Sequence, residues 1–379
     1  MTASRMQTFL QLLHVSDLHF SDTFYPQKSW TSRVPGLEVH DPQVAVALSR
    51  AIHLDQGPTS VAQHLIATGD LTTWGTTHAF QTALTYLRGR IVAGGPQPWI
   101  ALDAPQASVI PGNHDMWGDT LPTRALVTGA PSAARANFRQ FFHEPSPAAI
   151  SLHADRPFPY QRRLAYGPVA VYLYGIDSTE VHLARYPRWR NVLAEGYVSP
   201  QQLRDVEALV HTELHEPRMR LAALHHPLAY SQTNRAPWVG TLLNADSEVL
   251  PTLQRLGFSL ALCGHQHRGF IRQISAANMT CAPLWVCSVG TATQRVRFSP
   301  AQRQLLSKPY KCLNPDEQLA WEAVAQQCNE YRRYDMACDP QDPAQLLVTV
   351  HSYRYDPGQV SFVTNPHPLS LPRIDVINS

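Results

Sequence analysis

The 379-residue sequence has few lysines, no excess charge of either sign and no long apolar run. Only three of its 31 basic residues are lysines, and its 29 acidic residues leave a net charge of +2. Phosphate backbones are bound through many Lys and Arg contacts, so this balance argues against nucleic acid as a partner. No apolar stretch approaches the ~18 residues of a membrane span, and the N-terminal one is too short for a signal peptide. We therefore expect a cytoplasmic protein without a membrane span.

The six cysteines include no Cys-x-x-Cys pair, which argues against a structural zinc site. Their scattered positions instead predict buried free thiols in a reducing compartment. The apolar fraction of 44% is ordinary for a globular protein. A chain of this length can bury a core without disulfide bonds, either as one domain with insertions or as two domains.

Short apolar segments alternate with segments of helical periodicity along the first 290 residues. This alternation predicts an α/β core, in which loops at strand ends carry the chemistry. Ser199 is the expected N-cap of the clearest amphipathic helix. The predicted strands are 9–15, 64–68, 107–110, 169–176, 220–224, 259–262 and 285–289, and the predicted helices are 42–54, 77–87, 200–214 and 247–256.

The rest of the chain is less regular. Residues 116–165 are rich in Pro and Ala and predict an irregular insertion over one face. Residues 301–340 are polar and predict helix, broken at Pro315, and residues 346–363 alternate in period two around a turn and predict a hairpin. We expect a main domain over 1–300 and a C-terminal segment over 301–379. That segment is either a small appendage or a set of extra strands, and we expect it to pack on the core.

Histidine is abundant, with 18 residues, and several histidines lie beside Asp, Asn or Gly at the ends of predicted strands. Asp, Asn and His together suit first-row metal ions, and residues two apart on an extended backbone point to the same face. Any one of these motifs occurs by chance, but five in this order predict a metal site. They are Asp17-Leu18-His19, Gly69-Asp70, Gly112-Asn113-His114-Asp115, His225-His226-Pro227 and Gly264-His265-Gln266-His267.

The ordered set resembles the signature of the calcineurin-like metallophosphoesterase superfamily, which reads Asp-x-His, Gly-Asp, Gly-Asn-His-Asp/Glu, His and Gly-His-x-His. The resemblance implies a four-layer α/β/β/α sandwich, here with insertions and a C-terminal extension, and a centre of two divalent ions such as Mn, Fe or Zn. It implies that three residues bind the first metal and three the second, with Asp70 bridging both. Those residues are Asp17, His19 and His267 for the first metal, and Asn113, His225 and His265 for the second.

The same resemblance implies an activity, the hydrolysis of a small phosphodiester of the cyclic-nucleotide or glycerophosphodiester type. A hydroxide bridging the metals would attack in line, and His114, which is not a ligand, would assist the leaving oxygen. Asp70 and His114 are the expected catalytic residues. Asn113, His114 and Arg268 are the expected substrate contacts, although Arg268 can also be an ordinary solvated side chain.

Several alternatives stay open at this point. The run Gly69–Gly75 departs from the Gly-Asp-Leu-Thr-Asp-x-Gly pattern of the cyclic-nucleotide branch at its fifth residue, which is Thr73 rather than Asp, and the next residue is the bulky Trp74. A phosphomonoesterase or nuclease could use the same site, and a non-catalytic binding scaffold could keep the fold. Asp115 can orient a histidine or cap its turn, and His226 can pack or support a ligand. Trp74, Trp117 and Trp238 can stack on a base or pack.

Overall fold

The computed structural model describes most of the chain. The described residues are 8–24, 40–55, 61–88, 100, 106–116, 131–142, 149–153, 156–180, 195–229, 242–276, 283–293, 300–306, 313–325, 329–342, 344–365, 368–372 and 374–377.

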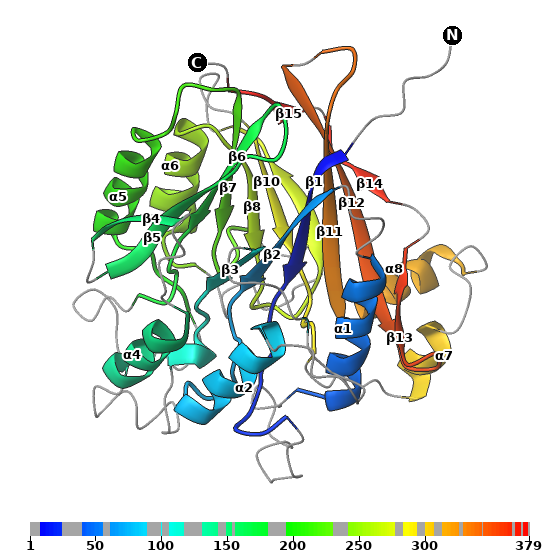
Figure 1. Ribbon diagram of the computed structural model, residues 1–379. Coiled ribbons are helices and arrows are strands. Elements are labelled where there is room, and N and C mark those ends of the chain that lie inside the picture. The colour runs from blue at the N-terminus through cyan, green and yellow to red at the C-terminus, as the bar shows by residue number, and fades with distance from the viewer. Residues whose placement is uncertain are drawn as a thin grey trace.

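Two β-sheets pack face to face, as Figure 1 shows from the side. Strands β1, β2 and β3 of the first sheet are parallel; β11 extends the sheet antiparallel to β1, and β12 is in turn antiparallel to β11. The first sheet follows the order β13 (Ser361–Thr364), β12 (Gln345–Asp356), β11 (Glu330–Cys338), β1 (Thr8–Val15), β2 (Ala62–Thr68), β3 (Ala107–Ile110), with β14 (Leu369–Ser370) and β15 (Ile374–Asp375) also paired to β12.

The second sheet has a parallel centre, β6, β7, β8 and β10, with antiparallel strands at both edges. Its order is β4 (Ala149–His153), β5 (Arg156–Leu164), β6 (Ala170–Gly175), β7 (Arg218–Ala223), β8 (Phe258–Cys263), β10 (Leu284–Ser288), β9 (Phe270–Ile274).

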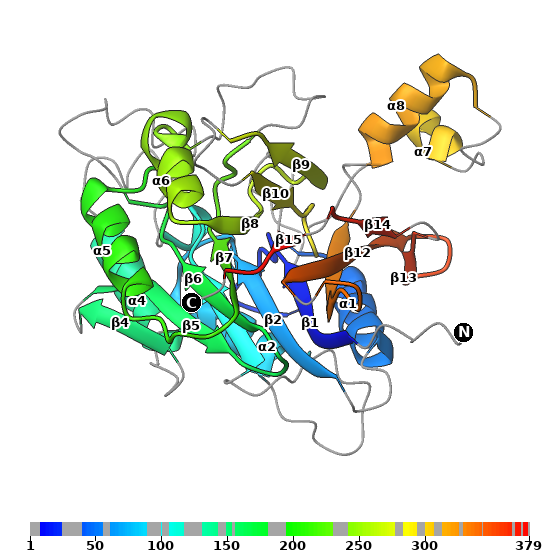
Figure 2. The same cartoon turned by 90° about the horizontal axis from the view of Figure 1, so that it is seen from above.

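Helices cover the outer faces of both sheets. Apolar side chains of α1, α2 and α4 share a core with the first sheet, and those of α5 and α6 share one with the second. Figure 2 shows α7 and α8 to one side of the sheets. The helices are α1 (Pro42–Asp55), α2 (Thr77–Arg88), α4 (Pro131–Phe142), α5 (Pro200–Val210), α6 (Leu250–Arg255), α7 (Pro300–Leu306) and α8 (Pro315–Ala325), with a 3-10 turn at His114–Met116 and a π-helical turn at Ala245–Val249.

The apolar runs of the sequence are strands buried on both faces. In β1, Leu10 and Leu12 face the second sheet, while Leu13 and Val15 face the helices. Successive side chains of a strand point to opposite faces, so a strand between two layers must be apolar at nearly every position. The α/β/β/α sandwich expected from the sequence is therefore confirmed.

Three regions differ from the sequence-based expectation. Residues 330–338, expected to be helical, form β11 between β1 and β12. The expected irregular insertion at 116–165 contains α4, β4 and β5, and β9 is a further strand that the sequence pattern does not predict. These strands carry many charged and polar residues, so their sequence lacks an apolar run. Pairing and burial, rather than intrinsic propensity, decide their conformation.

Other local expectations are confirmed. Ser199 caps α5, and its Oγ accepts a hydrogen bond from the Gln202 amide at 3.2 Å. Of the six cysteines, Cys263 and Cys287 are buried free thiols and Cys338 is a partly buried one, whereas Cys281, Cys312 and Cys328 lie outside the described residues. Within the described ranges, no helix combines the length and the hydropathy that a membrane crossing needs.

Candidate metal centre

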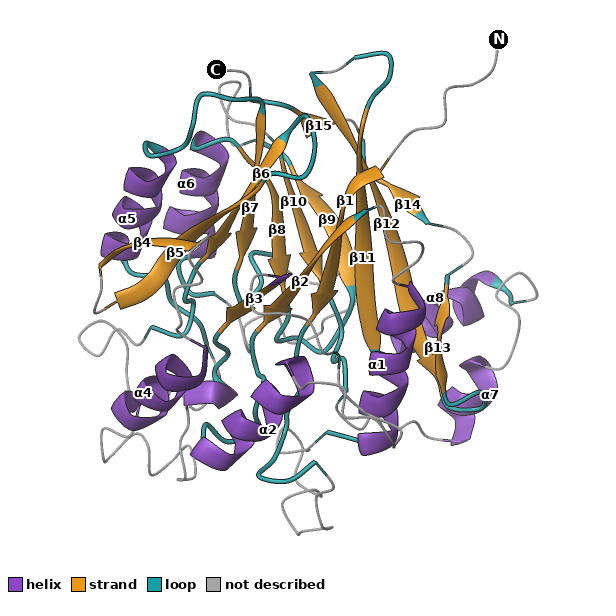
Figure 3. Ribbon diagram, in the orientation of Figure 1, coloured by secondary structure: helices purple, strands orange, loops and turns teal. Residues whose placement is uncertain are grey.

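The five histidine-rich and aspartate-rich motifs lie on loops that follow β1, β2, β3, β7 and β8. The first three strands are parallel to one another, and so are the last two, so each set of loops leaves one end of its sheet. Figure 3 shows the two sets of loops at the same edge of the sandwich, below the strands. The tertiary structure thus brings together side chains that are up to 250 positions apart in sequence.

The first cluster consists of Asp17, His19, Asp70 and His267, whose ligand atoms lie within 4.8 Å of one another. His267 Nε2 lies 3.1 Å from Asp17 Oδ1 and 3.2 Å from His19 Nε2. His19 Nε2 lies 3.9 Å from Asp17 Oδ1 and 4.0 Å from Asp70 Oδ2. Ligands bonded at ~2.1 Å to one ion stand roughly 3.0–4.2 Å apart, so these spacings suit a single cation.

The second cluster consists of Asp70, Asn113, His225 and His265. His225 Nε2 is its centre, at 3.0 Å from Asn113 Oδ1, 3.1 Å from His265 Nδ1 and 3.3 Å from Asp70 Oδ2. Two imidazoles, an amide oxygen and a carboxylate therefore converge as in the first cluster, and they can hold a second cation.

Asp70 belongs to both clusters through the same oxygen. Its Oδ1 accepts a hydrogen bond from the His114 amide at 2.8 Å, which leaves Oδ2 to face His19 on one side and His225 on the other. The glycine before it, Gly69, has φ of +93°, and a Cβ there would lie 2.6 Å from His225 Nδ1. The Gly-Asp pair is thus required by the close approach of three loops.

His114 lies beside the clusters with one ring nitrogen engaged. Its Nδ1 is 3.1 Å from the Thr73 carbonyl, to which it can donate, and its Nε2 is 4.0 Å from Asp70 Oδ2. The ring stands edge-on to His19, with centroids 4.7 Å apart. The Thr73 contact selects the tautomer that leaves Nε2 turned toward the two clusters.

The two neighbouring histidines after β7 have different contacts. His225 Nδ1 lies 2.7 Å from the Thr68 carbonyl, so its Nε2 is left for the second cluster. His226 Nδ1 lies 2.9 Å from Ser178 Oγ, and the His226 amide donates to that same oxygen at 3.0 Å. A nitrogen of His226 lies within 4.8 Å of ligand atoms of His225 and His265, so these three histidines are also placed to hold one ion together.

Asp115 ties the loop of Asp70 to the loop of Asn113. Its carboxylate accepts hydrogen bonds from the amides of Gly112, Leu71 and Thr72 and from the Thr72 hydroxyl, at 2.9 to 3.2 Å. Burial and the nearby Asp70 carboxylate raise the pKa of Asp115 to about 7, against the effect of these donors. Of the two roles left open by the sequence, the contacts match the capping of its turn, and they extend to the neighbouring loop.

The backbone is strained at most of the clustered residues. Asp17, His19, Asp70, His265 and His267 have φ between 48° and 70°, a region that L-residues rarely occupy. Elsewhere in the described residues, the only non-glycine with positive φ is Val360. Such strain costs about 1–3 kcal/mol per residue and clusters at functional sites, where the surrounding fold sustains it.

Charges in the clusters are balanced among carboxylates and imidazoles. Burial opposes a charged ring, but Asp70 raises the pKa of His225 to about 9, and Asp17 raises the pKa of His267. Burial lowers the pKa of His19 and of His265. Burial raises the pKa of both carboxyl groups, but the neighbouring imidazoles outweigh it. His267 holds the pKa of Asp17 below the ordinary range, and His225 does the same for Asp70.

A buried carboxylate oxygen of the first cluster fits a cation. Asp17 Oδ1 makes no hydrogen bond, although His267 Nε2 and His19 Nε2 lie 3.1 Å and 3.9 Å from it. His19 and His267 turn Nε2 atoms toward each other, an arrangement that a shared positive ion satisfies better than two imidazole lone pairs do. Cations binding here would replace the protons that now balance the carboxylates.

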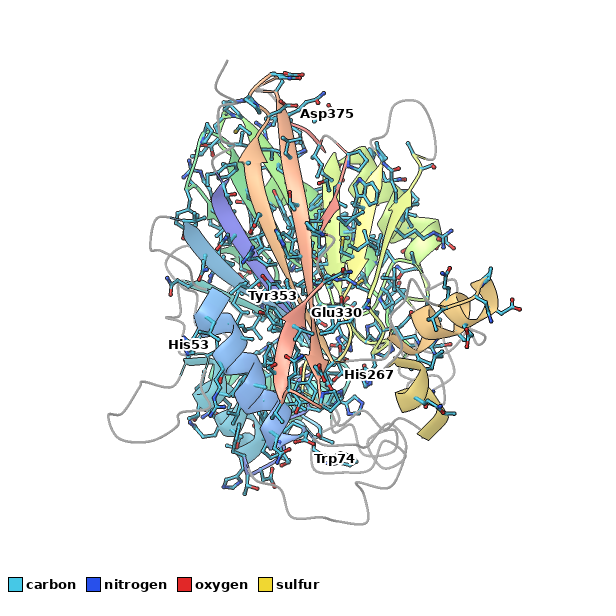
Figure 4. All side chains as sticks on the ribbon, turned by 90° about the vertical axis from the view of Figure 1, so that its right-hand side faces the viewer. His53, Trp74, His267, Glu330, Tyr353 and Asp375 are labelled. Carbon is cyan, nitrogen blue, oxygen red and sulfur yellow. The ribbon has the colours of Figure 1, made fainter. Side chains whose placement is uncertain are left out.

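The remaining residues that the sequence analysis proposed for the site belong to neither cluster. Arg268 directly follows His267 and is partly exposed. Trp74 is partly exposed and lies below His267 in Figure 4. Trp117 and Trp238 fall outside the described residues.

Sequence reasoning missed three residues that orient histidines in or beside the clusters: Thr68, Thr73 and Ser178. Thr68 and Thr73 act through backbone carbonyls, which any residue possesses, so no side-chain pattern could identify them. Ser178 follows a predicted strand end, which was the one available signal.

Comparison with known proteins decides the family. A family model described as calcineurin-like phosphoesterase matches residues 10–269, which is more than half of the chain. This chain belongs to the calcineurin-like phosphoesterase family. The match covers all five motifs and ends two residues after His267. Membership in this family supports a metal-dependent phosphoric ester hydrolase with a centre of two metal ions.

Solved structures match this family member at low sequence identity. A purple acid phosphatase from yellow lupin (Lupinus luteus) matches with a TM-score of 0.51 and 12% identity over 95% of this chain and 54% of its own. A dimetal phosphatase from Danio rerio matches with a TM-score of 0.48 and 14% identity over 94% of this chain and 99% of its own. This calcineurin-like chain thus spans about half the length of the lupin chain. A search of the curated proteins found no match.

Proposed function

We propose that this chain hydrolyses a small phosphodiester of the cyclic-nucleotide or glycerophosphodiester type, using two divalent ions such as Mn, Fe or Zn. The observation that carries the proposal is the position of Asp70 Oδ2, which faces His19 in one cluster and His225 in the other. One carboxylate oxygen between two sets of ligands is the arrangement that a two-metal hydrolase requires.

The proposed ligands divide between the two clusters. Asp70 bridges. Asn113 is a neutral ligand, so it adds no negative charge that would repel a phosphate, and it can also contact the substrate. Arg268, beside His267, is a proposed substrate contact. The first ion is held by Asp17, His19 and His267, and the second by Asn113, His225 and His265.

When bound, two cations at such a site neutralise phosphate charge and make a water molecule acidic enough to attack near neutral pH. His114 acts on the leaving oxygen, on the side of the phosphorus opposite to the attacking water. Its Nδ1 donates to the Thr73 carbonyl, so Nε2 can donate a hydrogen bond or a proton to the leaving oxygen when the ring is protonated on both nitrogens.

Sequence motifs favour a diester over the alternatives. The run Gly69-Asp70-Leu71-Thr72 and the turn Gly196–Ser199, followed by Gln202, resemble the cyclic-nucleotide branch of the family. The net charge of +2 offers little attraction for a nucleic-acid backbone. Hydrolysis of a phosphomonoester at the same site is the alternative that the experiment must separate.

The test is a substrate panel on protein stripped of metal and reloaded with Mn²⁺, Fe²⁺ or Zn²⁺. We expect hydrolysis of bis(p-nitrophenyl) phosphate, and of a cyclic nucleotide or glycerophosphodiester, that depends on added metal. Higher kcat/KM for p-nitrophenyl phosphate than for the diesters would make the chain a phosphomonoesterase. Absence of metal-dependent hydrolysis on every substrate would contradict a catalytic function.

We propose that residues 1–300 hold the catalytic unit and that residues 301–379 pack on it, since β11 and β12 pair into the first sheet. We also propose a cytoplasmic location, which the free thiols Cys263, Cys287 and Cys338 support. Limited proteolysis and fractionation of the native cells test these two points.

A further inference from the structure

A buried ion pair lies beside the first cluster, in a strand beyond the residues that the family model matches. Glu330 and Arg332 at the start of β11 are 1% and 3% exposed, and Arg332 Nε donates to Glu330 Oε1 at 2.9 Å. Figure 4 shows Glu330 near His267, at the end of the sheets opposite to Asp375. Neither residue belongs to a motif of the sequence analysis.

The ion pair contacts the chain two and three residues after His267. Arg332 Nη1 donates to the Phe270 carbonyl at 2.9 Å. The Glu330 carboxylate lies against Gly269, where a Cβ would meet Oε2 at 1.6 Å and Arg332 Nη2 at 2.8 Å. The two charged groups thus contact Gly269, the last residue before β9, and Phe270, the first residue of β9.

The same strand end also supports the loop of Asp17. The Glu330 amide donates to the Thr291 carbonyl at 3.1 Å, and the Thr291 hydroxyl donates to the Asp17 carbonyl at 2.8 Å. Asp17 and His267 are the closest carboxylate–imidazole pair of the first cluster, at 3.1 Å. One short segment of β11 therefore contacts the loop of His267 directly and the loop of Asp17 through Thr291.

A buried ion pair in this place calls for a role other than stability. Removing two charges from water costs about as much as their attraction returns, so apolar residues of similar size often stabilise a protein equally well or better. The pair does provide directional contacts. Arg332 fixes a carbonyl, and Glu330 leaves space for a glycine alone. Those contacts set the position of the loop that carries His267, whose φ is 50°.

We propose that Glu330 and Arg332 are positioning residues for the first metal, and that β11 completes the site by holding His267 at the ligand distance from Asp17. This inference rests on the proposed two-metal function, but its test reads metal binding rather than hydrolysis.

The experiment titrates metal-free, full-length protein with Mn²⁺ and follows the free ion by electron paramagnetic resonance. A His225→Ala background isolates the first cluster. In that background, Glu330→Ala is expected to weaken Mn²⁺ binding by ~10–100-fold, the usual effect of losing a group that orients a ligand. Glu330→Gln, which keeps an oxygen for the guanidinium, is expected to retain more of the affinity.

A matched control lies on the opposite face of the same strand. Asp335 pairs with Arg333 at 2.9 Å and with His351 at 3.1 Å, away from the clusters. Asp335→Asn removes an ion pair from β11 and is expected to leave the Mn²⁺ affinity unchanged. An equal loss in Asp335→Asn and Glu330→Ala would overturn the proposal, because a general weakening of β11 would then explain both.

A second variant keeps the ion pair intact, since an unpaired buried arginine can prevent folding. Gly269→Ala forces the loop away from Glu330 and is expected to cause a similar loss of affinity. Gly358→Ala, in the exposed hairpin where a Cβ would approach Asp356 Oδ1 only to 3.2 Å, is its control. If both substitutions act through the contact between Gly269 and Glu330, the double variant should lose no more Mn²⁺ affinity than the more damaging single variant.

The outcomes separate the two proposals. Wild-type Mn²⁺ affinity in folded Glu330→Ala or Gly269→Ala protein, with cooperative thermal unfolding, would refute the positioning role alone. A wild-type protein that binds two Mn²⁺ ions but hydrolyses no phosphoester would contradict the proposed function alone. A wild-type protein that binds no Mn²⁺ would contradict both.

Discussion

The two clusters share Asp70 but differ in charge and in support. The first cluster adds Asp17, so two carboxylates face two imidazoles, and all four of its residues have positive φ. The second adds only the neutral Asn113 to its two histidines, and only Asp70 and His265 are strained. His225 is fully buried, whereas the His267 side chain is 30% exposed.

This difference has a physical meaning. Two carboxylates attract a cation more strongly than one does, but they also repel each other when no cation is present. The first cluster therefore needs a rigid backbone to keep its ligands together, and the strained φ values and the contacts of Thr291 indicate where that rigidity arises. The second cluster is held by side-chain contacts, such as that of His225 Nδ1 to the Thr68 carbonyl.

The largest effect is expected where the clusters join. Asp70→Ala removes the one oxygen that faces both, so metal binding at both clusters and hydrolysis should fall by more than ~100-fold. Asp17→Asn should weaken the first cluster only. Elemental analysis and Mn²⁺ titration of both variants measure the difference. Two bound ions and wild-type turnover in Asp70→Ala would show that Asp70 does not bridge.

His114→Ala should leave both clusters able to bind metal and slow the reaction. A positioned general acid contributes ~10²–10⁴-fold, and it matters most when the leaving group is a poor one. We expect that loss on an alkyl or nucleoside phosphodiester and a much smaller one on a nitrophenyl diester. The ratio of kcat/KM values for the two substrates is the measurement. An equal loss on both would leave His114 with a positioning role, and loss of metal would make it a ligand.

Asn113→Ala sharpens the contrast between a charged and a neutral ligand. Because the amide contributes no charge, its removal should weaken the second cluster by only ~10-fold and leave the first cluster intact. Calorimetric titration with Mn²⁺ should then show one affinity unchanged and one lowered. A change in both affinities would mean that the clusters are not independent.

The smallest expected effect is on the pH dependence of stability, and it comes from His64, a histidine outside the clusters. Burial, with Arg162, lowers the pKa of His64 from 6.5 to about 3, and its Nε2 lies 2.9 Å from Ser108 Oγ. The unfolded chain therefore binds a proton that the folded one does not, so stability falls as the pH drops from 6.5 toward 3. Between pH 7 and pH 5 the loss is about 2 kcal/mol.

Urea unfolding of the metal-free protein at both pH values measures this loss. His64→Gln should reduce the pH-dependent change by about 2 kcal/mol. His53→Gln, at an exposed position on α1, is the control and should leave the change as in the wild type. An unaltered change in His64→Gln would show that other groups carry the acid sensitivity.

The family and the sandwich could be predicted because their signals are local. The apolar runs of β1, β2 and β8 identify strands buried on both faces, and the polar residues that follow them identify the loops. By contrast, β11 reads Glu-Tyr-Arg-Arg-Tyr-Asp and has no apolar run. It forms a strand because β1 and β12 pair with it on both sides, and such pairing is invisible in a 9-residue stretch.

The sequence by itself determined which residue types stand at the strand ends, and these types already indicate metal chemistry and a phosphoesterase. Only the tertiary structure decided how they are shared: that Asp70 turns Oδ2 to both clusters, that His225 rather than His226 points Nε2 at Asn113, and that Glu330 lies against Gly269. Residue type follows from the chain at each position. Distances between loops depend on how two sheets and a C-terminal strand pack, which is a property of contacts far apart in the sequence.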